Sequence, residues 1–110
     1  RLVGAGAEVV RVAPDAAGVA PAEVLEDLAG RGVNEVLVEA GPRLAGSLLA
    51  LGLVDELVIY QAPHIMGSET LRMFRTPGWT ALSQRAALEV QDVRNVGRDL
   101  KITAVPRDRN

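Results

Sequence analysis

The sequence contains no cysteine, which excludes disulfide bonds, thiolate nucleophiles and cysteine-based zinc sites. Its only histidine is His64, so there is no histidine cluster to hold a metal, and a charge-relay triad would have to use that single residue. No apolar run reaches the roughly 18 residues that a membrane span needs. We therefore expect neither a metal site nor insertion into a membrane.

An excess of charge of one sign is also lacking. The 12 basic and 14 acidic side chains give a formal net charge of −2. Domains that bind nucleic acid generally carry a basic face, so we expect no nucleic-acid partner. The lack of cysteine, together with the lack of a secretory-leader pattern in these residues, favours the reducing cytoplasm as the location.

The composition that is present indicates a globular domain. The 110 residues are 48% apolar, which suffices for a hydrophobic core and excludes the disordered and low-complexity classes. The chain begins with Arg1 rather than methionine, and its first residues resemble the last turn of a helix that Gly4 would terminate. We therefore expect residues 1–110 to be the carboxyl-terminal portion of a single domain whose amino-terminal part is absent.

Strands and helices alternate in the hydrophobic pattern. Short runs rich in β-branched and apolar residues predict strands over 8–12, 35–40 and 56–62. Apolar residues at helical spacing, each series opened by a proline, predict helices over 21–30 and 42–51. The predicted order is therefore strand, helix, strand, helix, strand.

The rest of the chain predicts an irregular segment and a hairpin. Prolines and glycines punctuate residues 63–83, where a single helical turn is expected near 70–74. Two alternating runs, 87–96 and 99–105, flank Gly97-Arg98, which is a hairpin signal.

Connection lengths then give the fold class. The two short crossovers imply parallel strands with right-handed connections, whereas the hairpin adds an antiparallel pair. The polar end, residues 107–110, predicts a frayed terminus. We therefore predict an α/β protein with a mixed sheet and helices on both faces.

The junction between the second predicted strand and its helix is the best candidate for a binding site. The free amides of a helix's first turn and the helix dipole attract anions such as phosphate. Gly41 would let a ligand approach the backbone, and Pro42 would fix the entry to the helix. The pattern is not a strict G-x-G-x-x-G fingerprint, and it equally fits a simple turn whose small residues serve packing.

Glu39 lies at the carboxyl end of the predicted strand, where ligands bind in open α/β sheets. It also fits an exposed carboxylate or one that caps a backbone amide. His64 follows Pro63 at a strand exit and is interpreted as a surface loop residue. The glycine pair Gly4 and Gly6 precedes a predicted strand, so we interpret it as a turn between helix and strand.

Four short motifs occur in order along residues 33–67, and a fifth feature is the terminal hairpin sequence DVRNVGRDLKITAVP. The motifs are Glu39-Ala40-Gly41-Pro42, Leu44-Ala45-Gly46, Gly52 to Leu57, and Ala62-Pro63 through Met66-Gly67. In this order they resemble the reductase domain of the riboflavin-biosynthesis deaminase–reductase family, known as the RibD C-terminal domain. The resemblance covers nearly all of the chain.

The resemblance implies a dihydrofolate-reductase-like fold. This is a three-layer α/β/α arrangement with a mixed, mostly parallel sheet and a C-terminal antiparallel hairpin. It also implies NADPH-dependent reduction of 5-amino-6-(5-phosphoribosylamino)uracil to the ribitylamino product. The implied partners are that small phosphoribosylaminopyrimidine and, in a homodimer, a second copy of the chain.

Matching positions carry the family's site onto this sequence. They imply that Glu39 contacts the substrate. They imply that NADPH is held by Gly41, Pro42, Arg43, Leu44, Ala45, Gly46 and Ser47. The sequence identifies no catalytic residue and does not separate NADPH from NADH. The family's domain is considerably longer, so we predict that these 110 residues alone are inactive.

Two alternatives to the riboflavin-pathway reductase stay open on sequence grounds. One is another dihydrofolate-reductase-like NADPH reductase that acts on a pterin-type ring. The other is a non-catalytic module, for oligomerisation or ligand sensing, on the same scaffold. Retention of the Glu39-Ala40-Gly41-Pro42 motif speaks against the second.

Overall fold

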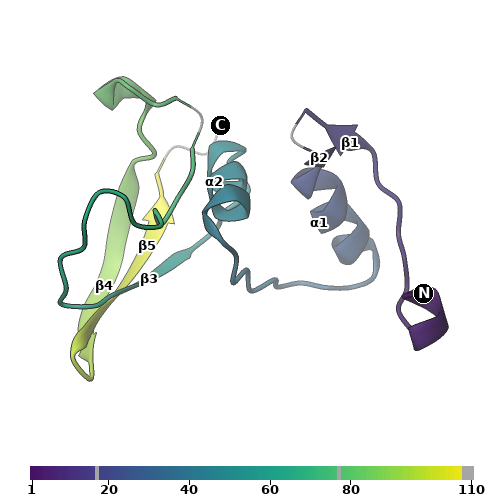
Figure 1. Ribbon diagram of the computed structural model, residues 1–110, viewed down its shortest axis with the longest axis horizontal. Coiled ribbons are helices and arrows are strands. Elements are labelled where there is room, and N and C mark those ends of the chain that lie inside the picture. The colour runs from purple at the N-terminus through teal and green to yellow at the C-terminus, as the bar shows by residue number, and fades with distance from the viewer. Residues whose placement is uncertain (17, 77, 108–110) are drawn as a thin grey trace. The chain divides into compact units, whose positions relative to one another are not determined.

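The computed structural model describes residues 1–16, 18–76 and 78–107. The chain divides into two compact units, Arg1–Leu37 and Val38–Asn110. Figure 1 shows the elements of each unit in chain order. Apart from Arg107, the terminus that we predict to be frayed lies outside the described residues.

The first unit contains one α-helix and very little strand. Its elements are the 3-10 turn η1 (Val3–Ala5), the strands β1 (Pro14–Asp15) and β2 (Gly18–Val19), and the helix α1 (Pro21–Gly30). Strands β1 and β2 pair antiparallel over two residues each. None of the described residues of this unit is fully buried, so the unit has no closed core of its own.

Helix α1 has the predicted bounds. Pro21 occupies its first turn, where an amide would lack a helical partner in any case. Past the last turn, Gly32 adopts a φ of +83°. The amide of Val33 then donates to the Leu28 carbonyl at 3.0 Å, which satisfies a carbonyl that the end of the helix leaves open.

The predicted strand at 8–12 is wrong, because residues 7–13 have no regular structure. A β-rich run forms a strand only where a second backbone accepts and donates hydrogen bonds. Glu8, within this segment, pairs with a side chain instead. Both guanidinium nitrogens Nη1 and Nη2 of Arg31, beyond the end of α1, donate to the Glu8 carboxylate at 2.8 Å.

Gly4, which the sequence predicts to end a helix at the start of the chain, lies inside η1 instead. Gly6, at a φ of +87°, ends that turn.

The second unit holds the main sheet. Its elements are the helix α2 (Pro42–Ala50), the strand β3 (Leu57–Gln61), the 3-10 turn η2 (Leu82–Gln84), and the strands β4 (Leu88–Val96) and β5 (Asp99–Pro106). The strand order is β3-β5-β4, and both pairings are antiparallel. The predicted second helix, third strand and hairpin are confirmed to within two residues at each end.

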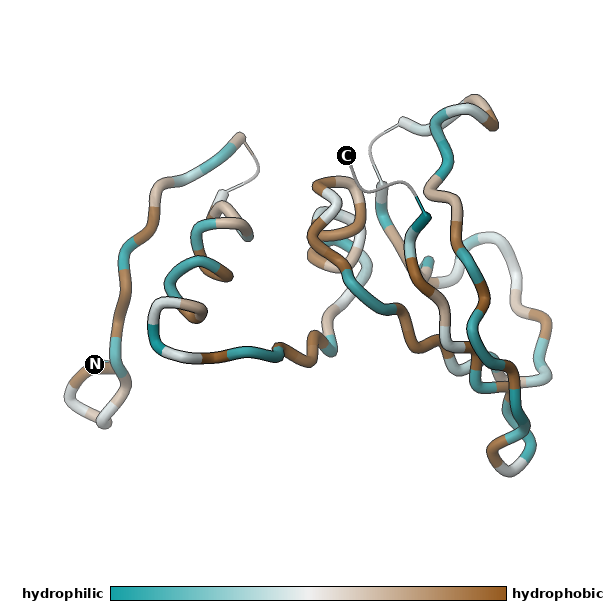
Figure 2. Tube along the Cα trace, turned by 180° about the vertical axis from the view of Figure 1, so that it is seen from behind, coloured by the Kyte–Doolittle hydropathy of each residue, from teal (hydrophilic) through white to brown (hydrophobic). Residues whose placement is uncertain are grey.

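The hairpin β4-β5 turns at Gly97, whose φ of +60° fits the first central position of a type II′ turn. A register shift between Val90 and Asp92 marks a bulge in β4. Apolar and polar residues are mixed along the hairpin (Figure 2). In β5, Ala104 is only 1% exposed, and with Leu48 of α2 it forms the buried apolar core of the described residues.

The predicted strand at 35–40 is also wrong. Residues 35–40 form no helix or strand and are exposed, with Leu37 84% exposed. The pairings found among the described residues are all antiparallel. The expected parallel strands at 8–12 and 35–40 therefore do not join a sheet, because no backbone among the described residues pairs with them.

The helical turn predicted near 70–74 does not form. The chain instead forms a turn between Gly67 and Thr70, where the Thr70 amide and hydroxyl donate to the Gly67 carbonyl at 3.2 and 2.8 Å. A helical turn forms later, at η2, where the Gln84 side-chain oxygen accepts the amides of Thr80 and Ala81 at 2.9 Å. That side-chain acceptor favours the later position.

Candidate anion-binding site at the start of helix α2

The start of α2 has backbone amides without a helical or side-chain partner. Gly41 is the N-cap residue, with φ −69° and ψ 173°, and its carbonyl accepts the Ala45 amide at 3.2 Å. Pro42 has no N–H. The amides of Arg43 and Leu44 therefore lie ahead of the first helical donor, and no side chain caps the helix.

The charge around this helix start favours an anion. The first turn contains no acidic residue, whereas Arg43 places an exposed guanidinium in it. The helix dipole adds partial positive charge at the same end. A phosphate placed here would meet amide donors and a cation, with no carboxylate in the first turn to repel it.

Gly41 leaves open space in front of those amides. Nothing lies within 4 Å of the position that a Cβ on Gly41 would occupy, although the backbone itself is ordinary extended backbone. Glycine is therefore not needed at this position for the fold. A β-carbon here would instead stand in the space through which a ligand reaches the amides. The residues present thus fit a bound phosphate group.

Glu39 precedes this helix start, in the segment without regular structure between α1 and α2. It is exposed, and no hydrogen bond or ion pair of its carboxylate is found among the described residues. Its assignment from the end of a strand loses support, since the strand at 35–40 does not form. Its place two residues before Gly41 keeps it next to the candidate site along the chain.

Two residues of the predicted cofactor set have other contacts in the structure. Gly46 is buried, and a Cβ on it would collide with the backbone of Arg75. The hydroxyl of Ser47 donates to the Arg43 carbonyl at 3.0 Å and is thus engaged within the helix. The structure therefore brings Gly41 and the residues up to Leu44 together at the helix start, with Gly46 and Ser47 one turn further on.

Sequence reasoning missed Arg75. Its amide donates to the Pro42 carbonyl at 2.8 Å, so the segment after β3 returns to the first turn of α2. No spacing or composition signal in the sequence indicates this contact, because it joins residues 33 positions apart through a segment without regular structure. His64 is an exposed loop residue, as predicted.

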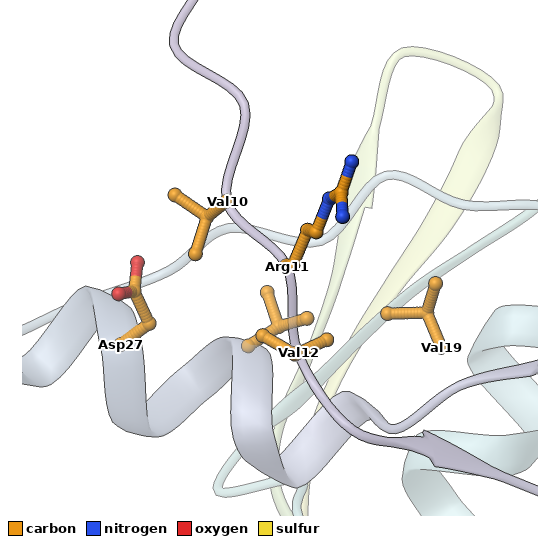
Figure 3. A pocket seen from close by; sticks show the side chains of 6 residues that line it. Val10, Arg11, Val12, Val19 and Asp27 are labelled. Carbon is orange, nitrogen blue, oxygen red and sulfur yellow. The ribbon is translucent and has the colours of Figure 1, made fainter.

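A concave feature lies within the first unit (Figure 3). It is an open cavity of about 410 Å³ between the irregular segment 7–13 and helix α1. It is lined by Val10, Arg11, Val12, Val19, Val24 and Asp27. Valine side chains dominate the lining, and the few polar groups do not converge on one point, so we assign it no chemistry.

Within residues 1–16, 18–76 and 78–107, no group of three or more histidine, cysteine, aspartate or glutamate side chains could hold a metal ion. No helix in those ranges is both long and apolar enough to cross a membrane.

Comparison with known proteins decides the family. The family described as "RibD C-terminal domain" matches residues 4–102. The chain belongs to this family. Among curated relatives, riboflavin biosynthesis protein RibD of Escherichia coli is 43% identical over 68 residues, which are 62% of this chain and 18% of that protein. RibD of Haemophilus influenzae is 35% identical over 77% of this chain and 23% of its own length.

A third relative carries the name of the reductase alone. The 5-amino-6-(5-phosphoribosylamino)uracil reductase of Buchnera aphidicola is 32% identical over 68% of this chain and 36% of its length. Among solved structures, Acinetobacter baumannii RibD, form 1, superimposes with a TM-score of 0.75 at 27% identity. That match covers 83% of this chain and 26% of the other. The chain thus spans about a quarter of the RibD structure it resembles.

Proposed function

We propose that these residues form part of an NADPH-dependent reductase. Its substrate would be 5-amino-6-(5-phosphoribosylamino)uracil and its product the ribitylamino compound. Family membership and the likeness to the 5-amino-6-(5-phosphoribosylamino)uracil reductase of Buchnera aphidicola support the reaction. The start of α2, with two uncapped amides, Arg43 and no carboxylate, supports a bound phosphate and carries the proposal.

In this proposal NADPH supplies the hydride, and the chain binds and orients the reactants. The amides of Arg43 and Leu44 donate to a cofactor phosphate, and the Arg43 guanidinium neutralises its charge. Gly41 leaves the approach open. Glu39 accepts hydrogen bonds from hydroxyl groups of the substrate's ribose.

We further propose the dihydrofolate-reductase-like, three-layer arrangement and a cytoplasmic homodimer for the natural full-length protein. The likeness to RibD of Acinetobacter baumannii, at a TM-score of 0.75, supports the fold. Residues 35–40 have no strand partner among the described residues, so a neighbouring strand could pair with them. Sedimentation of the full-length protein at several concentrations tests the dimer: a monomer throughout would contradict it.

Titration with NADPH tests the cofactor proposal directly. We expect saturable binding by the natural full-length protein, weakened by rising salt because a charged phosphate carries part of the interaction. NADH, titrated in parallel, measures the preference between the two cofactors. If the protein binds neither NADPH nor NADH, the proposal is overturned.

A further inference from the structure

The segment that follows β3 crosses helix α2 at Gly46. A Cβ built on Gly46 would come within 2.6 Å of the carbonyl carbon of Arg75 and closer still to its oxygen. Real Cβ atoms essentially never approach other atoms below 3.0 Å. Because the obstacle is backbone rather than a flexible side chain, any residue other than glycine would push the two segments apart.

The same segment forms a hydrogen bond with α2 one turn earlier in the helix. The Arg75 amide donates to the Pro42 carbonyl at 2.8 Å. Pro42 and Gly46 are four residues apart and therefore lie on the same face of the helix. The hydrogen bond at Pro42 and the lack of a side chain at Gly46 thus allow one backbone segment to lie against one face at the start of the helix. We call the contact among Pro42, Gly46 and Arg75 the α2 clasp.

We propose that the α2 clasp fixes the position of the helix start at which the cofactor phosphate binds. The proposal rests on the proposed function. Gly46 and Arg75 are then positioning residues, which act through their backbone and do not need to touch the cofactor. This differs from the direct contact with NADPH that the family resemblance implies for Gly46.

The location of the clasp explains why it would affect binding. Pro42 is in the same turn as the two open amides of Arg43 and Leu44, and it directly follows Gly41. Amide-to-oxygen hydrogen bonds operate between about 2.7 and 3.2 Å, so a shift of the first turn by about 1 Å would misplace both donors. Elsewhere, the helix could absorb a shift of this size without effect on a ligand.

Two variants break the clasp by different routes. Gly46→Ala inserts the colliding carbon, and Arg75→Pro removes the amide hydrogen that Pro42 accepts. Gly30→Ala is the matched control, because Gly30 is also a helical glycine, yet nothing lies within 4 Å of its Cβ position. Alanine should favour either helix intrinsically, so only the collision separates the two alanine variants.

The variants are made in the natural full-length protein and titrated with NADPH below the unfolding transition. We expect Gly46→Ala and Arg75→Pro each to weaken binding about tenfold or more, with kcat at saturating NADPH close to wild type. The double variant should bind NADPH about as weakly as the more affected of the two single variants, because both substitutions remove the same contact. Gly30→Ala should bind as wild type does.

Hydrogen exchange supplies a readout that does not depend on cofactor binding. The Arg75 amide should exchange faster in Gly46→Ala than in wild type. Faster exchange with unchanged NADPH affinity would overturn the proposal and leave the clasp a packing contact. Additive losses in the double variant would overturn it as well. If wild type itself fails to bind NADPH, the proposed function fails, while exchange still shows whether the clasp exists. Should Gly46→Ala not fold, Arg75→Pro gives the affinity result alone.

Discussion

Gly41 offers a substitution that separates binding from folding. Its backbone is extended at φ −69°, and a side chain there would meet nothing within 4 Å. Gly41→Val should therefore fold normally while its branched side chain blocks the approach to the helix amides. We expect the Kd for NADPH to rise about tenfold, equivalent to about 1.4 kcal/mol.

Thermal unfolding of the same Gly41→Val sample is the control for that prediction. A melting temperature close to wild type is expected. If the variant binds NADPH as tightly as wild type, a phosphate does not approach the helix through the space in front of Gly41.

Glu39 is predicted to serve the substrate rather than the cofactor. Its carboxylate is exposed, and the described residues offer it no ion pair, so Glu39→Gln should leave the fold intact. Loss of a charged acceptor for hydroxyl groups should reduce kcat/KM for the pyrimidine substrate about tenfold or more. The KM for NADPH should stay near wild type, and equal losses for both ligands would count against this role.

Part of the site was accessible to residue-level reasoning and part was not. The proline and glycine at the start of α2 are local signals, because each acts on its own backbone. Gly46 illustrates the limit: the sequence shows a small residue in a helix, but the reason, a crossing backbone at Arg75, lies 29 positions away. Such a contact depends on the path of an irregular segment, which no local rule specifies.

At the scale of elements, the hairpin β4-β5 depends on one left-handed residue. Gly97 adopts a φ of +60°, which side chains with a β-carbon rarely take. Gly97→Ala should destabilise the protein by about 1–2 kcal/mol. Denaturant unfolding measures this change, and Gly67→Ala is the control, because Gly67 has no positive φ and open space at its Cβ position. Equal midpoints for both variants would contradict the assigned turn.

The link between residue Glu8 and helix α1 should depend on pH. The Arg31 guanidinium donates to Glu8 and lowers the pKa of that carboxyl below its ordinary value. A lowered pKa means that the stabilising contribution is present above the ordinary pKa and is lost as the pH falls through the lowered one. The effect should be small and weakened by salt, because both side chains are exposed.

Glu8→Gln tests this link by comparison with wild type. The stability difference between the two should be present at neutral pH and vanish on acidification below the carboxyl pKa. Glu26→Gln, in helix α1, is the control, since no ion pair of Glu26 is found in the described part of the chain. A difference that persists unchanged in acid would show that the ion pair does not carry it.

Element prediction succeeded where the signal is local and failed where it depends on a partner. The bounds of α1 and α2 follow from proline at the start and apolar spacing within, and the hairpin follows from Gly97 between alternating runs. The runs 8–12 and 35–40 have the composition of strands. They remain unpaired because a strand also needs a neighbouring backbone, which composition cannot supply.

At the scale of the whole molecule, the two units differ in how much they bury. The second unit holds the only buried apolar side chains of the described residues, Leu48 and Ala104. The first has none, and several of its valines are half exposed. The chain covers 18% to 36% of the curated relatives discussed above, so we expect the 110 residues alone to lack reductase turnover.

Turnover of the natural full-length protein tests the central claim most directly. The measurement follows the loss of absorbance of the reduced nicotinamide as NADPH is oxidised on addition of 5-amino-6-(5-phosphoribosylamino)uracil. The account predicts oxidation that requires the substrate and falls in the Glu39→Gln variant, with none for the 110-residue chain alone. Substrate-independent or absent oxidation by the full-length protein would contradict it.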